Sequence, residues 1–301
     1  MREAELIALL RLQRLPRVNS ILAKKLLHYF GSAQAIFNAK KSDLLRIPGC
    51  EHRFLSVWDD RKYLEQAKTE LAFMRNRGIH LSSFLEEDYP ALLKQSVDGP
   101  LVLFRKGKIN FKNRRFLSIV GARRASLRGI HFVTELIANL APWNPVIVSG
   151  FSYGISIAAH QAALMHNLQT IGCLAHGLDR IYPKAFASYR SKIEENGGFV
   201  SDFWRESKNY RTDYLRRNCI IAGLSEATLV VESEEKSGAL VTADMAFSYD
   251  REVFSVPGRP GDRMSVGCNY LIKSQKAQAV TCAADILYFL NWEAKDKKDK
   301  I

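Results

Sequence analysis

From residue 116 onward the chain repeats one pattern: a short apolar run, a loop, and then an amphipathic segment. The apolar runs are "FLSIV" (116–120), "PVIVS" (145–149), "QTIGCL" (169–174), "GFVSDF" (198–203), "TLVVE" (228–232) and "EVFSVP" (252–257). Continuous apolar strands that alternate with amphipathic helices are typical of a parallel sheet covered on both faces. The pattern therefore predicts an α/β fold built on an extended Rossmann-like, mostly parallel sheet with helices on both faces.

The first quarter of the chain has a different rhythm. In residues 1–75 apolar residues recur at helical spacing, and the pattern breaks at Pro16, at Gly31 and at "IPGC" (47–50). We expect a small all-α domain there, of the helix-hairpin-helix or SAM-like kind. The Rossmann-like domain then covers residues 76–292, and residues 293–301 form a charged tail.

The formal net charge of +13 is concentrated in two stretches. Residues 101–150 contain nine Lys or Arg and a single acid, Glu135, while residues 1–50 contain nine basic residues and three acids. A local excess of this size favours a polyanion-binding face. A solvated surface that only aids solubility is the alternative that charge alone leaves open.

Cysteine usage and hydropathy exclude other classes of protein. The five cysteines are scattered, odd in number and without a CxxC pair, which argues against a disulfide framework or a zinc site. No stretch approaches the roughly 18 consecutive apolar residues of a membrane span, and the N-terminus lacks a signal-peptide pattern. We expect a cytoplasmic protein without a metal or cofactor.

The loops that follow the predicted strands share one chemistry. In an open α/β sheet, ligands bind outside the carboxyl ends of the strands. The loops at that edge are 121–126, 150–154, 175–184, 233–242 and 258–263, and all five combine glycine with Ser, Thr, Lys or Arg. Glycines allow a close approach, and helix N-termini favour anions. This edge is therefore predicted to bind phosphate.

Catalytic patterns are missing from the same loops. The chain has no GxxxxGK[ST] loop, and "VSGFSYG" (148–154) lacks the spacing of a nucleophile elbow. His160 lies in a predicted helix, where packing is the simpler role, while His176 lies in a rim loop and is a candidate ligand contact. We expect a binding protein and not an enzyme.

An ordered set of segments resembles the DNA-processing protein DprA (Smf) family. The matching segments are "DYPALLKQSVDGPLVLFRKG" (88–107), "IVGARRASLRG" (119–129), "IVSGFSYGISIAAHQAAL" (147–164), "GLDRIYPKA" (177–185), "RRNCIIAGLSEATLVVESEEKSGALVTADMA" (216–246), "VFSVPG" (253–258) and "GCNYLI" (267–272). The resemblance implies a protein that binds and protects single-stranded DNA during natural transformation and helps to load the recombinase RecA. It also implies a homodimer without established catalytic activity.

The resemblance assigns site residues individually. Arg123 stands at the arginine of the family's G-x-R stretch, and Arg217 and Asn218 match the start of its Arg-Asn-Arg stretch. The positions expected to form the phosphate pocket are Gly121, Ser126, Ser149, Gly150, Gly154, Ser237, Gly238 and Thr242. Further contacts proposed from charge and location at the rim are Arg124, Arg128, Lys184, Arg216 and Lys236. A strand of phosphates gripped by arginines explains why Arg123 and Arg124 replace small residues in this turn.

Some features depart from the family. Ser156 replaces the usual acid of Gly-Ile-Asp, and Cys219 replaces the second arginine of Arg-Asn-Arg, so one phosphate contact is expected to be missing. We also expect no C-terminal winged-helix domain, because the chain ends at Ile301. Phe151, Tyr153 and Tyr182 either stack on bases or pack between helices and sheet; the sequence leaves both roles open.

The loop before Thr242 also allows comparison with one class of enzyme. Nucleoside-phosphate glycosidases use a similar glycine-and-threonine loop, with a glutamate three residues beyond the threonine. The comparable loop here is "KSGALVTADM" (236–245), and the residue three beyond Thr242 is Met245. The missing general base favours a binding function.

Overall fold

The computed structural model describes residues 2–50, 52–207 and 211–293. The chain divides into two compact units, one formed by residues 1–89 and 97–104 and the other by residues 90–96 and 105–301. Within the described residues no helix is long and apolar enough to cross a bilayer. Of the expected tail at 293–301, all but Glu293 lies outside the described residues.

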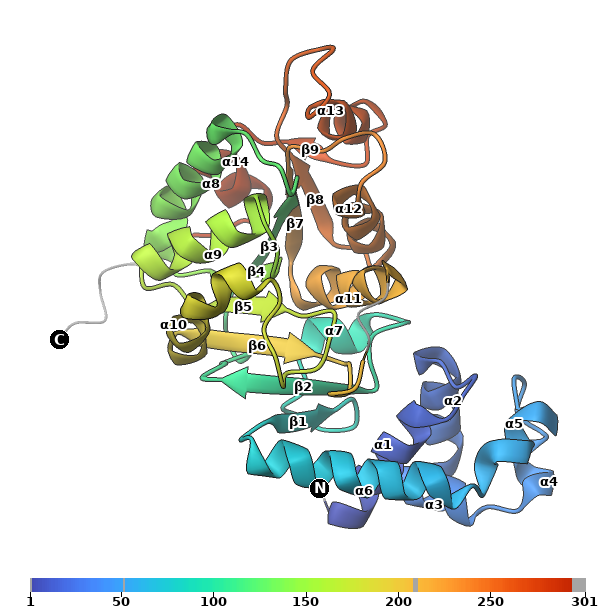
Figure 1. Cartoon of the computed structure of the whole chain (residues 1–301). Coiled ribbons are helices and arrows are strands. Elements are labelled where there is room, and N and C mark those ends of the chain that lie inside the picture. Colours follow the sequence, from blue (N-terminus) through green and yellow to red (C-terminus); the bar gives the residue numbers. More distant parts are fainter. Residues whose placement is uncertain (1, 51, 208–210, 294–301) are drawn as a thin grey trace. The chain divides into compact units, whose positions relative to one another are not determined.

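The first unit is built from helices, with one strand and half of a second. Its helices are α1 (Glu3–Arg14), α2 (Ser20–Phe30), α3 (Ala33–Asn38), α4 (Lys41–Leu44), α5 (His52–Trp58) and α6 (Arg61–Asn76), drawn in blue in Figure 1. The breaks expected from the sequence fall between these helices, and Gly31 ends α2 in the left-handed conformation at φ 80°. The carboxylate of Glu5 accepts hydrogen bonds from the amides of Ala33 and Gln34 at the start of α3. The strand β1 (His80–Ser83) and the first half of β2 (Val102–Gly107) complete this unit.

The strands form one sheet in the order β1-β2-β6-β5-β4-β3-β7-β8-β9, and all of them from β6 to β9 in this order belong to the second unit. The remaining strands are β3 (Phe116–Gly121), β4 (Val146–Gly150), β5 (Thr170–Cys173), β6 (Gly197–Ser201), β7 (Ala227–Val231), β8 (Glu252–Ser255) and β9 (Gln278–Ala279). All pairs from β6 to β9 are parallel, and β2 runs in the opposite direction to β6 (Figure 1). The predicted Rossmann-like, mostly parallel sheet is confirmed.

Helices cover both faces of this sheet. The second unit contains α7 (Ala91–Gln95), α8 (Leu127–Leu140), α9 (Ile155–Met165), α10 (Arg190–Glu195), α11 (Arg211–Leu224), α12 (Gly238–Ser248), α13 (Val266–Lys273) and α14 (Ala283–Phe289). Figure 1 shows α8, α9 and α14 on one side of the sheet and α11 and α12 on the other. A hydrophobic core lies on the first side, where Val133 and Ile137 of α8 pack with Leu117 and Ile119 of β3. Complete burial of both faces explains why the central strands are apolar without alternation.

The order of the strands sets where the loops meet. The chain passes from β3 through β4 and β5 to β6 in one direction, and then returns to place β7 on the other side of β3. The loops that follow β3 and β7 therefore diverge from a topological switch point, which is where open α/β sheets bind ligands.

Candidate nucleic-acid interface

The loops after β3 and β7 are joined through Glu232. The amide of Ala122 donates to the carbonyl of Glu232 at 2.8 Å. The Glu232 carboxylate accepts a hydrogen bond from the amide of Ser126 at 2.8 Å and a second one from the Ser126 hydroxyl. A Cβ atom on Gly129 would lie 2.6 Å from the carboxylate carbon of Glu232. The N-terminus of α8 is thus filled by a side chain of the protein, and Ser126, an expected phosphate contact, caps this helix.

The β3 loop lies directly on the first turn of α9. The amide of Ile155 donates to the carbonyl of Ala122 at 3.1 Å. Gly154 has φ 75°, and a Cβ atom there would lie 2.6 Å from the carbonyl oxygen of Arg123. Only glycine combines this conformation with this contact, so Gly154 positions the arginine-bearing loop and does not itself need to contact a ligand.

Arg217 is the most unusual residue of the site. It lies on α11, is only 7 % exposed, and donates to the carbonyl of Cys173 at the end of β5. Its Nε also donates to the side-chain oxygen of Asn218 at 3.4 Å. No carboxylate of the described residues forms an ion pair with it. Burial and the neighbouring Arg123 lower the pKa of Arg217, yet a guanidinium stays charged in proteins. Within the part of the chain that the structure describes, this buried cation therefore has no counter-ion.

The Cys173 thiol does not neutralise this cation. Burial raises the pKa of Cys173 to about 12, so the thiol is protonated at neutral pH. An uncompensated buried charge is costly. An anion that reaches the carboxyl ends of β4 and β5 would repay that cost.

Arg123 and Arg217 approach the same aromatic ring. The Arg123 guanidinium carbon lies 5.1 Å from the ring centroid of Tyr214, and that of Arg217 lies 5.8 Å from it. Both distances are within the range of cation–π attraction. Arg123 is exposed while Arg217 is buried, so the ring contacts one exposed and one buried cation. Tyr214 was not predicted from the sequence; its position one helical turn before Arg217 was the available signal.

The N-terminus of α12 forms another part of the site. Ser237 caps this helix by accepting from the amide of Leu240 at 3.4 Å. The carbonyl of Gly238 accepts from the side chains of Asn218 at 3.2 Å and of Thr242 at 3.0 Å. Space is open where a Cβ atom of Gly238 would lie. Thr242 is buried with its hydroxyl on this carbonyl, so it supports the turn.

A second arginine of α11 is held differently. Nη2 of Arg216 lies 2.6 Å from a carboxylate oxygen of Asp202, and its guanidinium carbon lies 4.7 Å from the ring centroid of Phe203. Burial raises the pKa of Asp202, and Arg216 partly offsets this effect. Arg216 is therefore a partnered cation, in contrast to Arg217.

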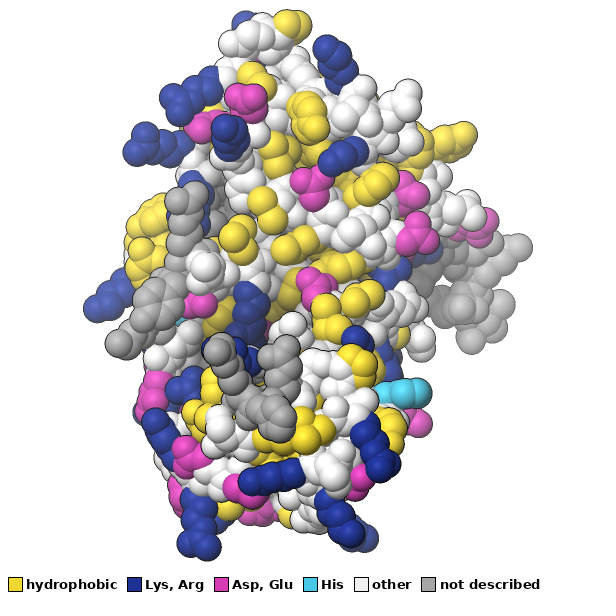
Figure 2. All heavy atoms as spheres, turned by 90° about the vertical axis from the view of Figure 1, so that its right-hand side faces the viewer, with side chains coloured by type: hydrophobic (Ala, Val, Ile, Leu, Met, Phe, Trp, Pro, Cys, Tyr) yellow, Lys and Arg dark blue, Asp and Glu magenta, His cyan; other side chains and the backbone are white. Residues whose placement is uncertain are grey.

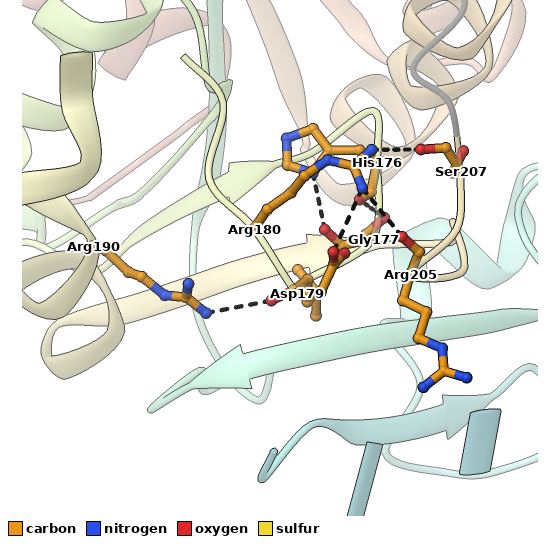
Figure 3. Close-up of polar contacts among 9 residues, drawn as sticks. His176, Gly177, Asp179, Arg180, Arg190, Arg205 and Ser207 are labelled. Carbon is orange, nitrogen blue, oxygen red and sulfur yellow. Dashed lines mark hydrogen bonds and ion pairs between the residues drawn. The ribbon is translucent and has the colours of Figure 1, made fainter. Parts of the chain in front are cut away.

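The loop after β5 is fixed by an arginine network (Figure 3). Arg180 donates to the carbonyl of Arg205 at 3.1 Å and to that of Ser207. Arg190 donates to the carbonyl of Leu178 at 3.3 Å. His176, a candidate ligand contact from the sequence, is only 2 % exposed, and burial lowers its pKa. The ring thus lies beneath the loop and not on its outer surface.

The other expected contacts fall into two groups. Ser149 is buried in β4 with its hydroxyl on the carbonyl of Ile119 at 2.6 Å, and the backbone of Gly121 lies against the carbonyl of Val231. The cations Arg124, Arg128, Lys184 and Lys236 are all exposed. The buried residues shape the site, whereas the exposed cations are free to contact a ligand.

Aromatic residues near the rim are also divided. Phe151 is buried and makes edge-to-face contacts with Phe186 and Phe199. Tyr153 is 50 % exposed and Tyr182 is 51 % exposed. Phe151 therefore packs in the interior, while the two tyrosines remain accessible.

The face of the molecule at the carboxyl end of β6 carries both basic and acidic side chains. Figure 2 shows this face, with basic, acidic and hydrophobic side chains interspersed. Among the described residues, no group of three or more His, Cys, Asp or Glu side chains is arranged to hold a metal ion. The particular cations of the site, and not a uniform positive surface, distinguish it.

Comparison with known proteins places these features in a family. The family model for DNA recombination-mediator protein A matches residues 80–291. The chain is 36 % identical over 246 residues to the DNA processing protein DprA of Streptococcus pneumoniae, covering 81 % of this chain and 85 % of that protein. It is 32 % identical over 272 residues to DprA of Bacillus subtilis, covering 90 % and 91 %.

Solved structures agree with the sequence comparison. The X-ray structure of DprA from Streptococcus pneumoniae matches with a TM-score of 0.75 at 28 % identity, covering 94 % of this chain and 96 % of that one. A structure of DprA from Helicobacter pylori, described by its single-stranded DNA binding mode, matches with a TM-score of 0.64 at 26 % identity, covering 71 % and 98 %. The chain therefore belongs to the DNA recombination-mediator protein A family, which the sequence motifs had indicated.

Proposed function

We propose that this protein is a recombination mediator that binds single-stranded DNA at the carboxyl ends of β3, β4, β5 and β7. The observation that carries the proposal is the buried guanidinium of Arg217 at the end of β5, for which no carboxylate of the described residues serves as a counter-ion. A phosphate group supplies the anion that this cation lacks. The relatives named above, which are DNA processing proteins, support the same reading.

The arrangement of the cations suggests how a DNA strand is bound. Arg123, which is exposed beside the ring of Tyr214, contacts the DNA strand first. Arg217 then binds a phosphate group at the inner end of the site. Exposed cations such as Arg124 and Lys236 then pair with neighbouring phosphates. Because contacts of this kind do not read base edges, we expect little sequence preference and a strong dependence on salt.

The proposal extends to biological role and partners. A binding protein of this family protects incoming single-stranded DNA in natural transformation and presents it to RecA, and it acts as a homodimer in the cytoplasm. We assign no catalytic step to the site: Glu232, the acid nearest the switch point, is committed to Ser126, and the glycosidase position beyond Thr242 is Met245.

Fluorescence anisotropy of a labelled oligothymidine, measured across a salt series, tests the proposal. Arg123→Ala should weaken binding by about 1–3 kcal/mol and flatten the salt dependence. Arg77→Ala is the matched control, because Arg77 is an exposed arginine 5.9 Å from the ring of Phe73 in the helical unit. Absence of binding by the wild-type protein at low salt, or equal losses in both variants, would refute the proposed site.

A further inference from the structure

Residues 107–115, here called the strap, cross the opposite edge of the sheet from the candidate site. The amide of Lys108 donates to the carbonyl of Glu194 at 2.9 Å, just before β6 begins. Asn110 exchanges two hydrogen bonds with the side chain of Gln169, at 2.9 and 3.0 Å, just before β5. The strap therefore passes the amino-terminal ends of β6 and β5 in turn.

The strap continues past β4 before the chain enters β3. Nη2 of Arg114 donates to the side chain of Asn144 at 3.1 Å. The carbonyl of Arg115 accepts from the amide of Val146, the first residue of β4, at 2.7 Å. Neighbouring strands lie about 4.8 Å apart, so a segment that passes β6, β5 and β4 extends over about 10–15 Å.

The backbone of the strap is fixed by its contacts with the sheet. Gly107 has φ 113°, and a Cβ atom there would lie 2.7 Å from Cα of Gly198 and 2.9 Å from the carbonyl oxygen of Glu194. The amide of Lys112 donates to the side chain of Asn110 at 2.9 Å. Because these contacts fix the backbone of the strap, its basic side chains start from fixed positions.

Five cations line this edge, and we call them the basic ridge. They are Lys106, Lys108, Lys112, Arg114 and Arg115. None of them forms an ion pair with a described residue; Arg115 is held by the backbone carbonyl of Glu293 at 3.1 Å. They account for five of the nine basic residues in positions 101–150, so the charge that the sequence concentrates there is divided between two edges of the sheet.

The acids near the basic ridge do not neutralise it. Glu194 is paired with Arg190 at 2.8 Å, and Glu226 accepts from the amide of Phe116 and from the indole of Trp292. Glu195 and Glu293 are exposed acids of this edge, and Asp250 and Glu252 are exposed further along it, at the start of β8. The excess of positive charge at the edge therefore remains available to a partner.

We propose that the basic ridge is a second binding surface for the phosphate backbone of single-stranded DNA, used when a long strand is bound. This inference rests on the proposed function and adds a second contact region to it. A row of cations matches a polymer with regularly repeated negative charge. The strap has no exposed large hydrophobic side chain, which a protein partner would need as an anchor. Nucleic acid is therefore the occupant that the chemistry favours.

The position of the basic ridge predicts a dependence on DNA length. A strand of six residues is about 20 Å long, so the two edges are separated by about that distance. A short oligonucleotide that fills the candidate site does not reach the ridge, whereas a long one passes around the domain to it. Oligothymidines of about 8 and about 40 nucleotides distinguish the two cases, because single binding modules cover about 4–16 nucleotides.

The test compares Lys108→Glu/Lys112→Glu with the wild-type full chain by anisotropy at both lengths. We expect unchanged affinity for the short probe and a loss of at least about fivefold for the long probe, with a salt slope shallower by about 1–2. The neutral variant Lys108→Gln/Lys112→Gln should lose less. The matched control Lys25→Glu/Lys62→Glu has the same change in net charge but places it on exposed lysines of the helical unit.

Each outcome decides between the two proposals. Equal affinity of the double variant and the wild type for the long probe overturns the basic ridge and leaves the candidate site intact. An equal loss in the helical-unit control also overturns it, because total charge then explains the effect. If the wild type binds only the long probe and the ridge variant abolishes that binding, the candidate site fails while the ridge stands.

Discussion

The guanidinium of Arg217 lies against Gly150, so that a Cβ atom on residue 150 would stand 2.7 Å from Nη1. Gly150 ends β4, and its carbonyl is 3.1 Å from Nε2 of His160. The absence of a side chain at this position thus creates the space in which the buried cation lies. The pair Gly150–Arg217 makes the inner end of the site.

Gly150→Ala should weaken DNA binding through Arg217. The added methyl group displaces the guanidinium, which is the flexible end of a long side chain, so the fold itself should lose little stability. We expect a loss of affinity of about tenfold, or about 1.4 kcal/mol. A double-mutant cycle with Arg217→Gln checks this: the second change should add almost nothing once the first is present. Additive losses would show that Gly150 acts independently of Arg217.

Arg217→Gln should separate binding from stability. No carboxylate of the described residues is paired with Arg217, so its removal leaves no opposite charge unpaired, and the lost bond to the Cys173 carbonyl is the main cost. We therefore expect the free energy of unfolding to change by no more than about 2 kcal/mol. DNA affinity should fall by at least tenfold in the same protein. Urea denaturation and anisotropy measure the two quantities. A loss of several kcal/mol in stability would indicate that Arg217 is mainly a structural residue.

Tyr214 should act by positioning the two arginines. Tyr214→Leu removes the aromatic face and should lower DNA affinity by about 0.5–1 kcal/mol, while Tyr214→Phe should retain most of it. Salt titrations of both variants provide the measurement. If Phe and Leu reduce affinity equally, the hydroxyl and not the ring face of Tyr214 is what matters.

Glu232 should stabilise the switch point without contacting DNA. Glu232→Ala leaves the exposed amide and hydroxyl of Ser126 to water in place of this acceptor, and we expect a loss of about 0.5–1.5 kcal/mol in unfolding free energy. Glu235→Ala, an exposed acid of the same loop, is the control and should change stability by less than about 0.5 kcal/mol. Chemical denaturation of both variants measures the difference, and equal stabilities would contradict the role assigned to Glu232.

His160 should make stability depend on pH. Burial lowers its pKa from 6.5 to about 4, so the folded protein keeps the ring neutral while the unfolded chain takes up a proton near pH 6.5. The contribution of His160 to the free energy of unfolding is complete above pH 6.5 and is lost as the pH falls toward 4. Between about pH 7.5 and pH 5 the loss should be about 2 kcal/mol. His160→Gln should show a correspondingly smaller loss over the same range, because the contributions of other groups are shared by both proteins; an identical pH dependence would argue against it.

The sheet was predictable because burial on both faces gives strands a simple signature. Each predicted run from 116 to 257 contains most of one strand, and the errors lie at the ends. The run "GFVSDF" continues past the end of β6 at Ser201, since Asp202 turns away to meet Arg216. The two-residue strand β9 was missed because Gln278–Ala279 is too short to carry a periodic pattern.

The site was predictable in its location but less so in its chemistry. The parallel strands bring the glycine-containing loops to one edge of the sheet, as the sequence predicted, while ligand binding at that edge stays a prediction. Arg217 followed from the family motif. The sequence did not reveal that Arg217 is buried or that Tyr214 lies beside it, because both depend on how α11 packs on the sheet. Nor did it reveal that Ser126 would be bonded to Glu232, which is 106 positions away in the chain.

The bond between Glu232 and Ser126 also restricts what kind of molecule this fold can accept. In dinucleotide-binding relatives of the fold, the first helix after the first strand of the core receives a pyrophosphate at its N-terminus. Here the carboxylate of Glu232 occupies that position, where a cofactor phosphate binds in those relatives. The N-terminus of α8 is therefore not open to the phosphate of a free mononucleotide or dinucleotide. The arginines that remain, together with the N-terminus of α12, favour a ligand that spreads its charge beyond a single helix end, as a polymer does.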